Sequence, residues 1–310
     1  MAAALEQSAL KDVAYAGSDF SSLLQKEFKP RSDEAKSAVE AAVLTLAQQA
    51  LSNSTIIGKD VTKSIQAMIA AIDEELTAQI NQILHNEDFQ KLESAGRGLH
   101  YMVNNTESDE NLKIRVMDIS KKELHKTVKK FKGAAWDQSP IFKKIYEEEY
   151  GQFGGDPFGA IVGDYHFDQS PPDVELLGEM AKISASAHAP FITGASPNLM
   201  QMESWQELAN PRDLTKIFST PEYAGWRSLR ESDDSKYLGL CMPRFLARTP
   251  YGAKTNPIDE FDFEEDVAGA DHSKYAWANA AYAMATNINR SYKLYGWGSR
   301  IRGIESGGAV

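Results

Sequence analysis

The sequence predicts an α+β fold in which a mixed α/β body follows a helical N-terminal region. Apolar residues recur at helical spacing through most of the first hundred positions, and from about residue 111 short strand-like segments alternate with helices. A chain of 310 residues is long enough for one large domain or two ordinary ones. We therefore expect a flexible N-terminal arm (1–31), a helical region (32–106) and a mixed α/β body that is cut in mid-domain (107–310).

The N-terminal arm is punctuated by Gly17, by Pro30 and by several serines, yet it contains one short apolar cluster, Phe20, Leu23, Leu24 and Phe28. Leu24 and Phe28 would share a face if this segment became helical. Such a cluster either docks onto a partner or folds back onto the core of its own chain, and the sequence alone leaves both interpretations open.

Three helices are expected after the arm, over residues 32–51, 60–84 and 88–103. The second is long, with a narrow apolar stripe that suits packing in a bundle or against another chain. The third carries its apolar stripe on one face, at Phe89, Leu92, Leu99 and Val103. Gly96 lies on that same face, where it marks either a close approach or a defect.

The body is expected to alternate between strands and helices, with a loop-like acidic stretch over 250–272. Alternating or continuous apolar runs predict strands at 112–119, 160–167, 188–193 and 237–242. Helical spacing and proline positions predict helices at 121–131, 139–150, 176–187, 211–219, 221–231 and 273–295.

Composition excludes several classes of protein. The net charge of -11 and the pI near 5.1 argue against nucleic acid as the main partner. No apolar run is long enough to span a membrane, and the first residues lack the pattern of a secretory signal. One cysteine cannot form an internal disulfide, which favours a reducing cytoplasm.

No motif demands catalysis, a cofactor or a metal. The glycine-rich run 151–159 leaves an acidic helix and enters a strand, the reverse of a phosphate-binding loop. Asp164, His166 and Asp168 alternate along a predicted strand and could hold a divalent metal, but a solvated strand face is the better interpretation. Cys241 is expected to be a buried structural thiol.

Charge is distributed unevenly along the chain. A basic helix face comprises Lys121, Lys122, Lys126, Lys129, Lys130 and Lys132, and an acidic run comprises Asp259, Glu260, Asp262, Glu264, Glu265 and Asp266. Such runs are usually solvated, although in an assembly of identical copies they could set the register between neighbours.

Several segments resemble the large subunit of the type VI secretion contractile sheath, the TssC or VipB family. The resemblance covers nearly the whole chain from about residue 32, and its densest motifs lie at 139–168, 171–196, 207–218, 222–252, 272–297 and 300–310. It implies a structural, non-enzymatic protein of the bacterial cytoplasm, held to the membrane complex through the baseplate. The implied partners are the small sheath subunit (TssB or VipA), further copies of the chain in a helical sheath, the Hcp inner tube and the AAA+ unfoldase ClpV.

The resemblance also implies an unfoldase-recognition helix near the N-terminus, whose nearest counterpart here contains Leu23, Leu24 and Phe28. Family members carry Trp where this chain has Gly96, so we expect Gly96→Trp to raise thermal stability. They also continue into a C-terminal region with sheath-linking strands, which we expect this chain to lack. The alternative is a cytosolic, non-enzymatic binding or adaptor protein that forms a discrete complex.

Overall fold

Three short parallel strands organise the body of the chain. The computed structural model describes residues 61–210, 213–269 and 271–302, together with Ser37, Ala41 and Thr45. Within these residues the sheet has the order β1-β2-β3, and β2 pairs in parallel with both neighbours. The strands are β1 (Ile161–Phe167), β2 (Phe191–Ala195) and β3 (Leu238–Cys241).

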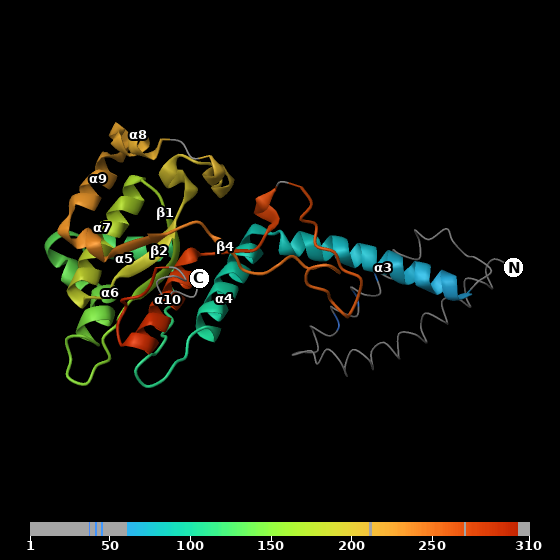
Figure 1. Cartoon of the computed structure of the whole chain (residues 1–310), viewed down its shortest axis with the longest axis horizontal. Coiled ribbons are helices and arrows are strands. Elements are labelled where there is room, and N and C mark those ends of the chain that lie inside the picture. The colour runs from blue at the N-terminus through green and yellow to red at the C-terminus, as the bar shows by residue number, and fades with distance from the viewer. Residues whose placement is uncertain are drawn as a thin grey trace. The chain divides into compact units, whose positions relative to one another are not determined.

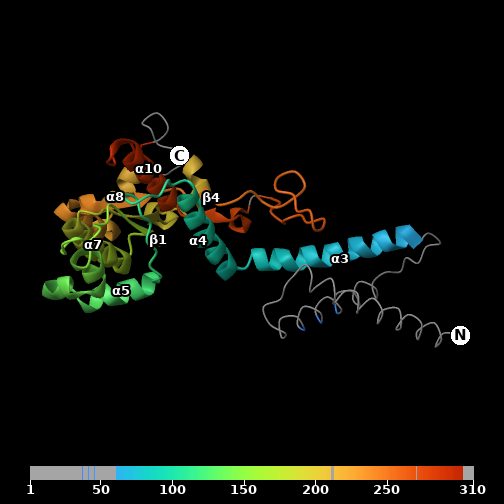
Figure 2. The same ribbon diagram turned by 90° about the horizontal axis from the view of Figure 1, so that it is seen from below.

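Helices cover both faces of this sheet. One face packs against α7 (Pro171–Ala187), which in turn contacts α5 (Lys121–Lys130) and α9 (Ala224–Glu231). The other face packs against α10 (Ala280–Tyr295), which contacts α4 (Glu87–Asn104). Figures 1 and 2 show this layering, with α5 and α10 on opposite sides of the strands.

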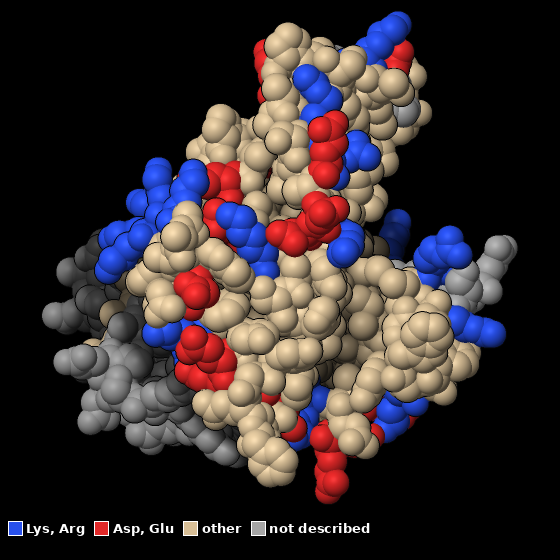
Figure 3. All heavy atoms as spheres, turned by 90° about the vertical axis from the view of Figure 1, so that its left-hand side faces the viewer, with Lys and Arg blue, Asp and Glu red and all other residues tan. Residues whose placement is uncertain are grey.

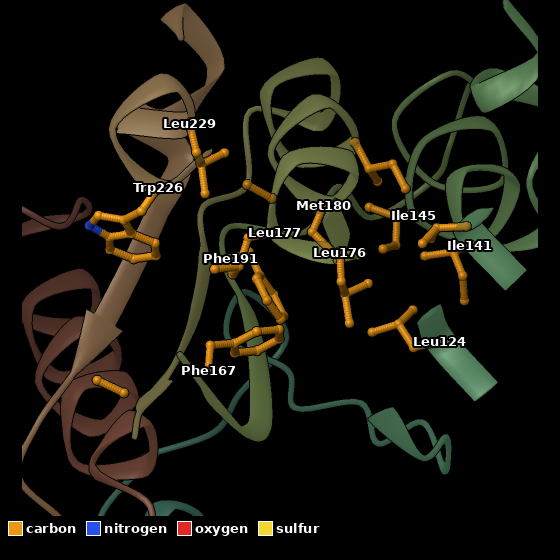
Figure 4. Packing of buried hydrophobic residues seen from close by; sticks show 14 of the residues in the cluster. Leu124, Ile141, Ile145, Phe167, Leu176, Leu177, Met180, Phe191, Trp226 and Leu229 are labelled. Atoms are coloured by element: carbon orange, nitrogen blue, oxygen red, sulfur yellow. The ribbon is translucent and has the colours of Figure 1, made fainter. Parts of the chain in front are cut away.

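The central strand carries the core. All five residues of β2 are buried, as a strand covered by helices on both faces requires. Figure 4 shows α7 between the sheet and the neighbouring helices, with Leu177 toward Phe191 and Leu176 toward Leu124. Phe167, Leu177 and Phe191 are almost completely inaccessible to solvent.

Short elements complete the described chain. A two-stranded antiparallel ribbon joins β4 (Phe245–Leu246) to β5 (Trp277–Ala278). The remaining elements are α3 (Val61–Leu84), η1 (Gly133–Gln138), α6 (Pro140–Phe142), η2 (Lys143–Glu147), η3 (Pro197–Met200), η4 (Trp205–Ala209), α8 (Leu214–Ser219), η5 (Pro221–Tyr223), η6 (Asp233–Tyr237) and η7 (His272–Lys274).

The chain divides into two compact units. The first comprises residues 1–84 and 251–266, and the second comprises 85–250 and 267–310. In the first unit, Asn81 of α3 donates to the carbonyl of Glu264 and accepts from the backbone N–H of Asp266, at 3.1 and 2.8 Å. The division at residues 31 and 106 that the sequence suggests stays a prediction.

The α+β fold class is confirmed, and so are most of the helices. The helix expected at 32–51 lies outside the described residues apart from Ser37, Ala41 and Thr45, which are helical. The helix expected at 139–150 is interrupted, because α6 passes into a short π-helical turn. The helix expected at 273–295 begins only at Ala280.

The strand expected at 112–119 is wrong. These residues form no regular secondary structure, no described strand pairs with their backbone, and Val116 and Met117 are exposed. Side chains fix the segment instead, since Lys113 and Arg115 pair with Asp156. The Tyr165 hydroxyl donates to the carbonyl of Ile119 at 2.6 Å. Apolar alternation alone does not make a strand when the backbone does not pair with a sheet.

Candidate assembly surfaces

One face of α4 is pressed onto α10. Gly98 and Met102 are the buried residues of α4, and the aromatic ring of Tyr282 covers Gly98. A Cβ at position 98 would lie 2.3 Å from Tyr282 Cδ2, so glycine is required at this crossing. The small buried residues Ala281 and Ala285 of α10 allow the two helices to approach closely.

Polar contacts hold the same helix in place. The Glu93 carboxylate accepts from Arg97 Nε and Arg248 Nε, both at 2.7 Å. Burial of Glu93 opposes its ionisation, but the hydrogen bonds from Arg248 and Arg97 outweigh it and hold its pKa below the usual value. The Ser94 hydroxyl donates to the carbonyl of Trp277 in β5.

The opposite face of α4 carries an exposed apolar stripe. Phe89, Leu92, Gly96 and Val103, which we call the α4 seam, are exposed in the described structure. Leu99, which falls between Gly96 and Val103 at the three-four spacing, is instead partly buried against Met102 and Tyr282. Leu92 is 72% exposed and Val103 45% exposed. The sequence located this stripe, but the core of the chain lies on the other side of the helix.

Gly96 sits in the middle of the α4 seam and is exposed, and a Cβ built there meets nothing within 4 Å. A Trp at this position would fill no cavity in the described chain. The expected gain in stability from Gly96→Trp stays a prediction, and it would have to come from helix propensity and surface packing, not from a filled cavity. The close-approach glycine of α4 is Gly98.

The lysines of the α5 region divide into two groups. Lys121 Nζ lies 2.7 Å from Asp173 Oδ1, and Lys132 pairs with Glu175. Hydrogen bonds from Lys132 and His125 lower the pKa of Glu175. The remaining lysines, which we call the α5 basic face, are exposed and have no carboxylate within ion-pair distance in the described part of the chain; they are Lys122, Lys126, Lys129 and Lys130.

The acidic run also contains residues that bond within the chain and residues that do not pair with the described part of it. Glu264 and Glu265 bond to the backbone N–H groups of Ala253 and Tyr251 and so close the loop on itself. Asp259, Glu260 and Asp262, which we call the acidic loop, stay exposed and form no ion pair with any described residue. Figure 3 shows clustered basic and acidic side chains among broad uncharged areas on one face of the protein.

Of the three candidate metal ligands, Asp164 and His166 lie in β1 and Asp168 directly follows it, and the buried His166 Nε2 has no hydrogen-bond partner among the described residues. Asp164 accepts from the Tyr282 hydroxyl at 3.1 Å, and Asp168 accepts from the backbone N–H of Ser170 at 2.8 Å. The register of β1 shifts between Gly163 and His166, so regular alternation of these side chains is lost. Among the described residues, no group of three or more His, Cys, Asp or Glu side chains could hold a metal ion.

The glycine-rich run and the cysteine lie in surroundings that explain them by packing and chain turning. The run 151–159 opens no helix, and a Cβ at Gly155 would lie 2.2 Å from the carbonyl oxygen of Glu149. Cys241 ends β3, and burial raises the pKa of its thiol to about 11. Both features indicate packing and turn formation.

Leu23, Leu24 and Phe28 lie outside the described residues, so the candidate unfoldase-recognition segment stays a prediction. Over the part of the chain that is described, no helix is both long and apolar enough to cross a lipid bilayer.

The sequence did not predict the buried contacts of α4. Gly98 and Met102 are four residues apart and therefore share a face, but a glycine carries no apolar signal. The partners Arg248 and Tyr282 lie more than 150 residues further along the chain, beyond the reach of any local pattern.

Exposed apolar and charged surfaces of this kind are typical of proteins that bind other proteins. The family model of VipB (EvpB/VC_A0108, tail sheath N-terminal domain) matches residues 66–310. The chain is also 73% identical over 293 residues to the type VI secretion system sheath protein TssC1 of Pseudomonas aeruginosa. That match covers 94% of this chain and 59% of the relative.

The chain therefore belongs to the VipB family of tail sheath proteins, a family of structural proteins and not of enzymes. It spans about three-fifths of the length of the curated relative that it matches.

Proposed function

We propose that the chain is a structural subunit of a type VI secretion contractile sheath in the bacterial cytoplasm. It pairs with the small sheath subunit, and the pairs polymerise around an Hcp tube whose expulsion follows contraction. The observation that carries this proposal is the family match over residues 66–310, together with the 73% identity to a sheath protein. The baseplate links the polymer to the membrane complex.

The α4 seam is the surface that we assign to the small sheath subunit. A stripe of apolar residues at three-four spacing accepts the apolar face of another helix. Its opposite face is fixed on α10 through Gly98 and on Arg248 through Glu93, so the stripe is presented from a rigid element. Rigid presentation reduces the entropy lost on binding.

Co-expression with the small sheath subunit, followed by size exclusion and negative-stain microscopy, tests the proposal. Tubes with cogwheel-like cross-sections support the sheath function directly. A stable pair without tubes supports the subunit pairing and favours the alternative of a discrete complex. Absence of any complex contradicts the proposal.

Two matched variants test the role of the α4 seam. Leu92→Asp places a charge on an exposed position, so we expect normal folding and loss of the complex. Leu294→Asp makes the same change at a leucine of α10 that is 57% exposed, and we expect it to keep the complex. Equal behaviour of the two variants would remove the α4 seam from the interface.

For the unfoldase, we propose that Leu23, Leu24 and Phe28 form the segment that ClpV recognises. The supporting observation is their apolar character within a polar arm. The double variant Leu24→Asp/Phe28→Asp should abolish ClpV binding to contracted sheaths, measured by co-sedimentation. Undiminished binding would refute this assignment and leave the sheath function untouched.

A further inference from the structure

The α5 basic face carries lysines that form no ion pair with the described part of the chain. Five of the ten residues of α5 are lysines and one is glutamate. Lys122, Lys126 and Lys129 follow one another at spacings of four and three, so they lie along one side of the helix. Like charges at this spacing destabilise a helix. Glu123 and Glu175 are near enough to Lys126 and Lys129 to feel their charge, but neither carboxylate is within ion-pair distance of them.

The element that presents these lysines is firmly held. Leu124 and Val128 are buried against the core, and the Ser120–Glu123 capping box fixes the start of the helix. Lys121 is tied to α7 through Asp173. The outward lysines therefore project from a fixed backbone, which favours a specific contact over loose ionic screening.

The acidic loop offers the complementary charge. Its three carboxylates are exposed on a segment closed by Glu264 and Glu265 and tied to α3 through Asn81. Both patches occur once in each chain, on different compact units.

We propose that the α5 basic face of one copy of this chain docks onto the acidic loop of a second copy. This inference rests on the proposed function and specifies one of its contacts. Two different patches that bind each other form a head-to-tail contact, which leaves one free patch at each end and propagates into an open helical polymer. A sheath is such a polymer.

The overall negative charge of the chain makes a second copy a suitable partner for the α5 basic face. The net charge of -11 makes two copies repel each other at long range, and the α5 basic face is a local exception that can fix their orientation. Exposed charges are screened within about 8 Å at physiological salt, so the attraction acts only between surfaces already in register.

Cross-linking between two labelled copies tests the contact. The chain has one cysteine, so Cys241→Ser gives a background without thiols. In that background, one preparation carries Lys126→Cys and a second, tagged preparation carries Glu260→Cys. Both are assembled together with the small sheath subunit and treated with a short bismaleimide. We expect a covalent dimer of the two preparations. A control that replaces Lys126→Cys by Lys216→Cys, an exposed position on α8, should give none.

Charge reversal supplies the second readout. The triple variant Lys122→Glu/Lys126→Glu/Lys129→Glu should raise the subunit concentration at half-assembly by about tenfold. The variant Asp259→Lys/Glu260→Lys/Asp262→Lys should do the same, and combining the two in one chain should restore assembly. Lys143→Glu/Lys216→Glu/Lys236→Glu makes the same change in net charge at exposed lysines elsewhere and should assemble normally.

Each outcome of these experiments supports or overturns the proposed contact. Cross-linking with rescue by the combined variant supports the contact. Assembly without cross-links, or charge reversal on α5 that the combined variant does not rescue, overturns it while the sheath function stands. Failure of the unaltered chain to assemble with the small sheath subunit overturns the proposed function and this contact together.

Discussion

At the scale of single residues, the two glycines of α4 make opposite predictions. A Cβ at Gly98 would overlap the ring of Tyr282, which is itself fixed by a hydrogen bond to Asp164. We expect Gly98→Ala to lower the free energy of unfolding by about 2 kcal/mol through overpacking. Denaturant titration followed by circular dichroism measures the change.

Gly96→Ala is the matched control in the same helix. Position 96 is exposed and open, so alanine adds helix propensity without a clash. We expect a gain of about 0.5–1 kcal/mol in the same titration. If both alanine variants shift the midpoint in the same direction, the packing of Gly98 against Tyr282 is refuted.

The thiol of Cys241 should react slowly. Burial raises its pKa from 9.0 to about 11, so at pH 8 the folded chain holds about a hundredfold less thiolate than an unperturbed thiol would. Thiol labelling at pH 8 should be slow in buffer and fast in denaturant. The exposed Lys126→Cys thiol, in a Cys241→Ser chain, should label quickly under both conditions. Rapid labelling of native Cys241 would contradict its burial.

At the scale of elements, Glu93 links the stability of α4 to pH. Its folded pKa lies below the usual value of 4.5, so the unfolded chain takes up a proton first as the pH falls. The stabilisation is complete above about pH 4.5 and is lost as the pH falls through the folded pKa.

We expect Glu93→Gln to lower the free energy of unfolding at pH 7 by about 3 kcal/mol, because Arg248 loses its buried partner. The variant should also lose less stability than the parent between pH 5 and pH 3, in denaturant titrations across that range. Glu87→Gln, at an exposed ion pair on the same helix, should behave as the parent does. A pH profile of Glu93→Gln parallel to that of the parent would count against the contact.

The elements that the sequence predicted well are those with strong local signals. The long apolar stripe of α3, the helical spacing of α5 and the strand pattern of 160–167 each led to an element of the expected type. The segment 112–119 failed because its alternation is satisfied by side-chain contacts without a pairing strand. Proline positions brought α8 and α9 close to their true starts, whereas α10 begins later than its alanine-rich sequence suggested.

The assembly surfaces were predicted in part. The lysine and acidic runs are visible in the sequence, but only the structure separates Lys121 and Lys132, which pair with α7, from the α5 basic face. The sequence located the apolar stripe of α4 but not what covers it, because an apolar stripe at helical spacing has the same pattern whether it meets its own chain or another.

At the scale of the whole second unit, local stability against opening should be highest in the central strand and should fall with distance from the sheet. Every residue of β2 is buried, and the Thr193 hydroxyl bridges the carbonyls of Gly163 and Tyr165. We expect the amides of Phe191–Ala195 to exchange with deuterium only through global unfolding. Amides of residues 113–118, which have no regular secondary structure and donate no backbone hydrogen bond in the described structure, should exchange fastest. Mass spectrometry of the two peptides makes the comparison, and equal rates would contradict the fold.

The packing of α4 on α10 has a consequence for how the protein is made. The Ser94 hydroxyl and its acceptor on Trp277 are 183 residues apart in the chain. At ribosomal rates of 5–20 residues per second, α4 leaves the exit tunnel about 10–40 s before β5 and α10, which pack against it, have been synthesised. During that interval the apolar side chains of Met102 and Leu92 are both exposed to solvent, on opposite sides of one helix. A nascent sheath chain is therefore most exposed to aggregation, and most in need of a chaperone, between the synthesis of these two helices.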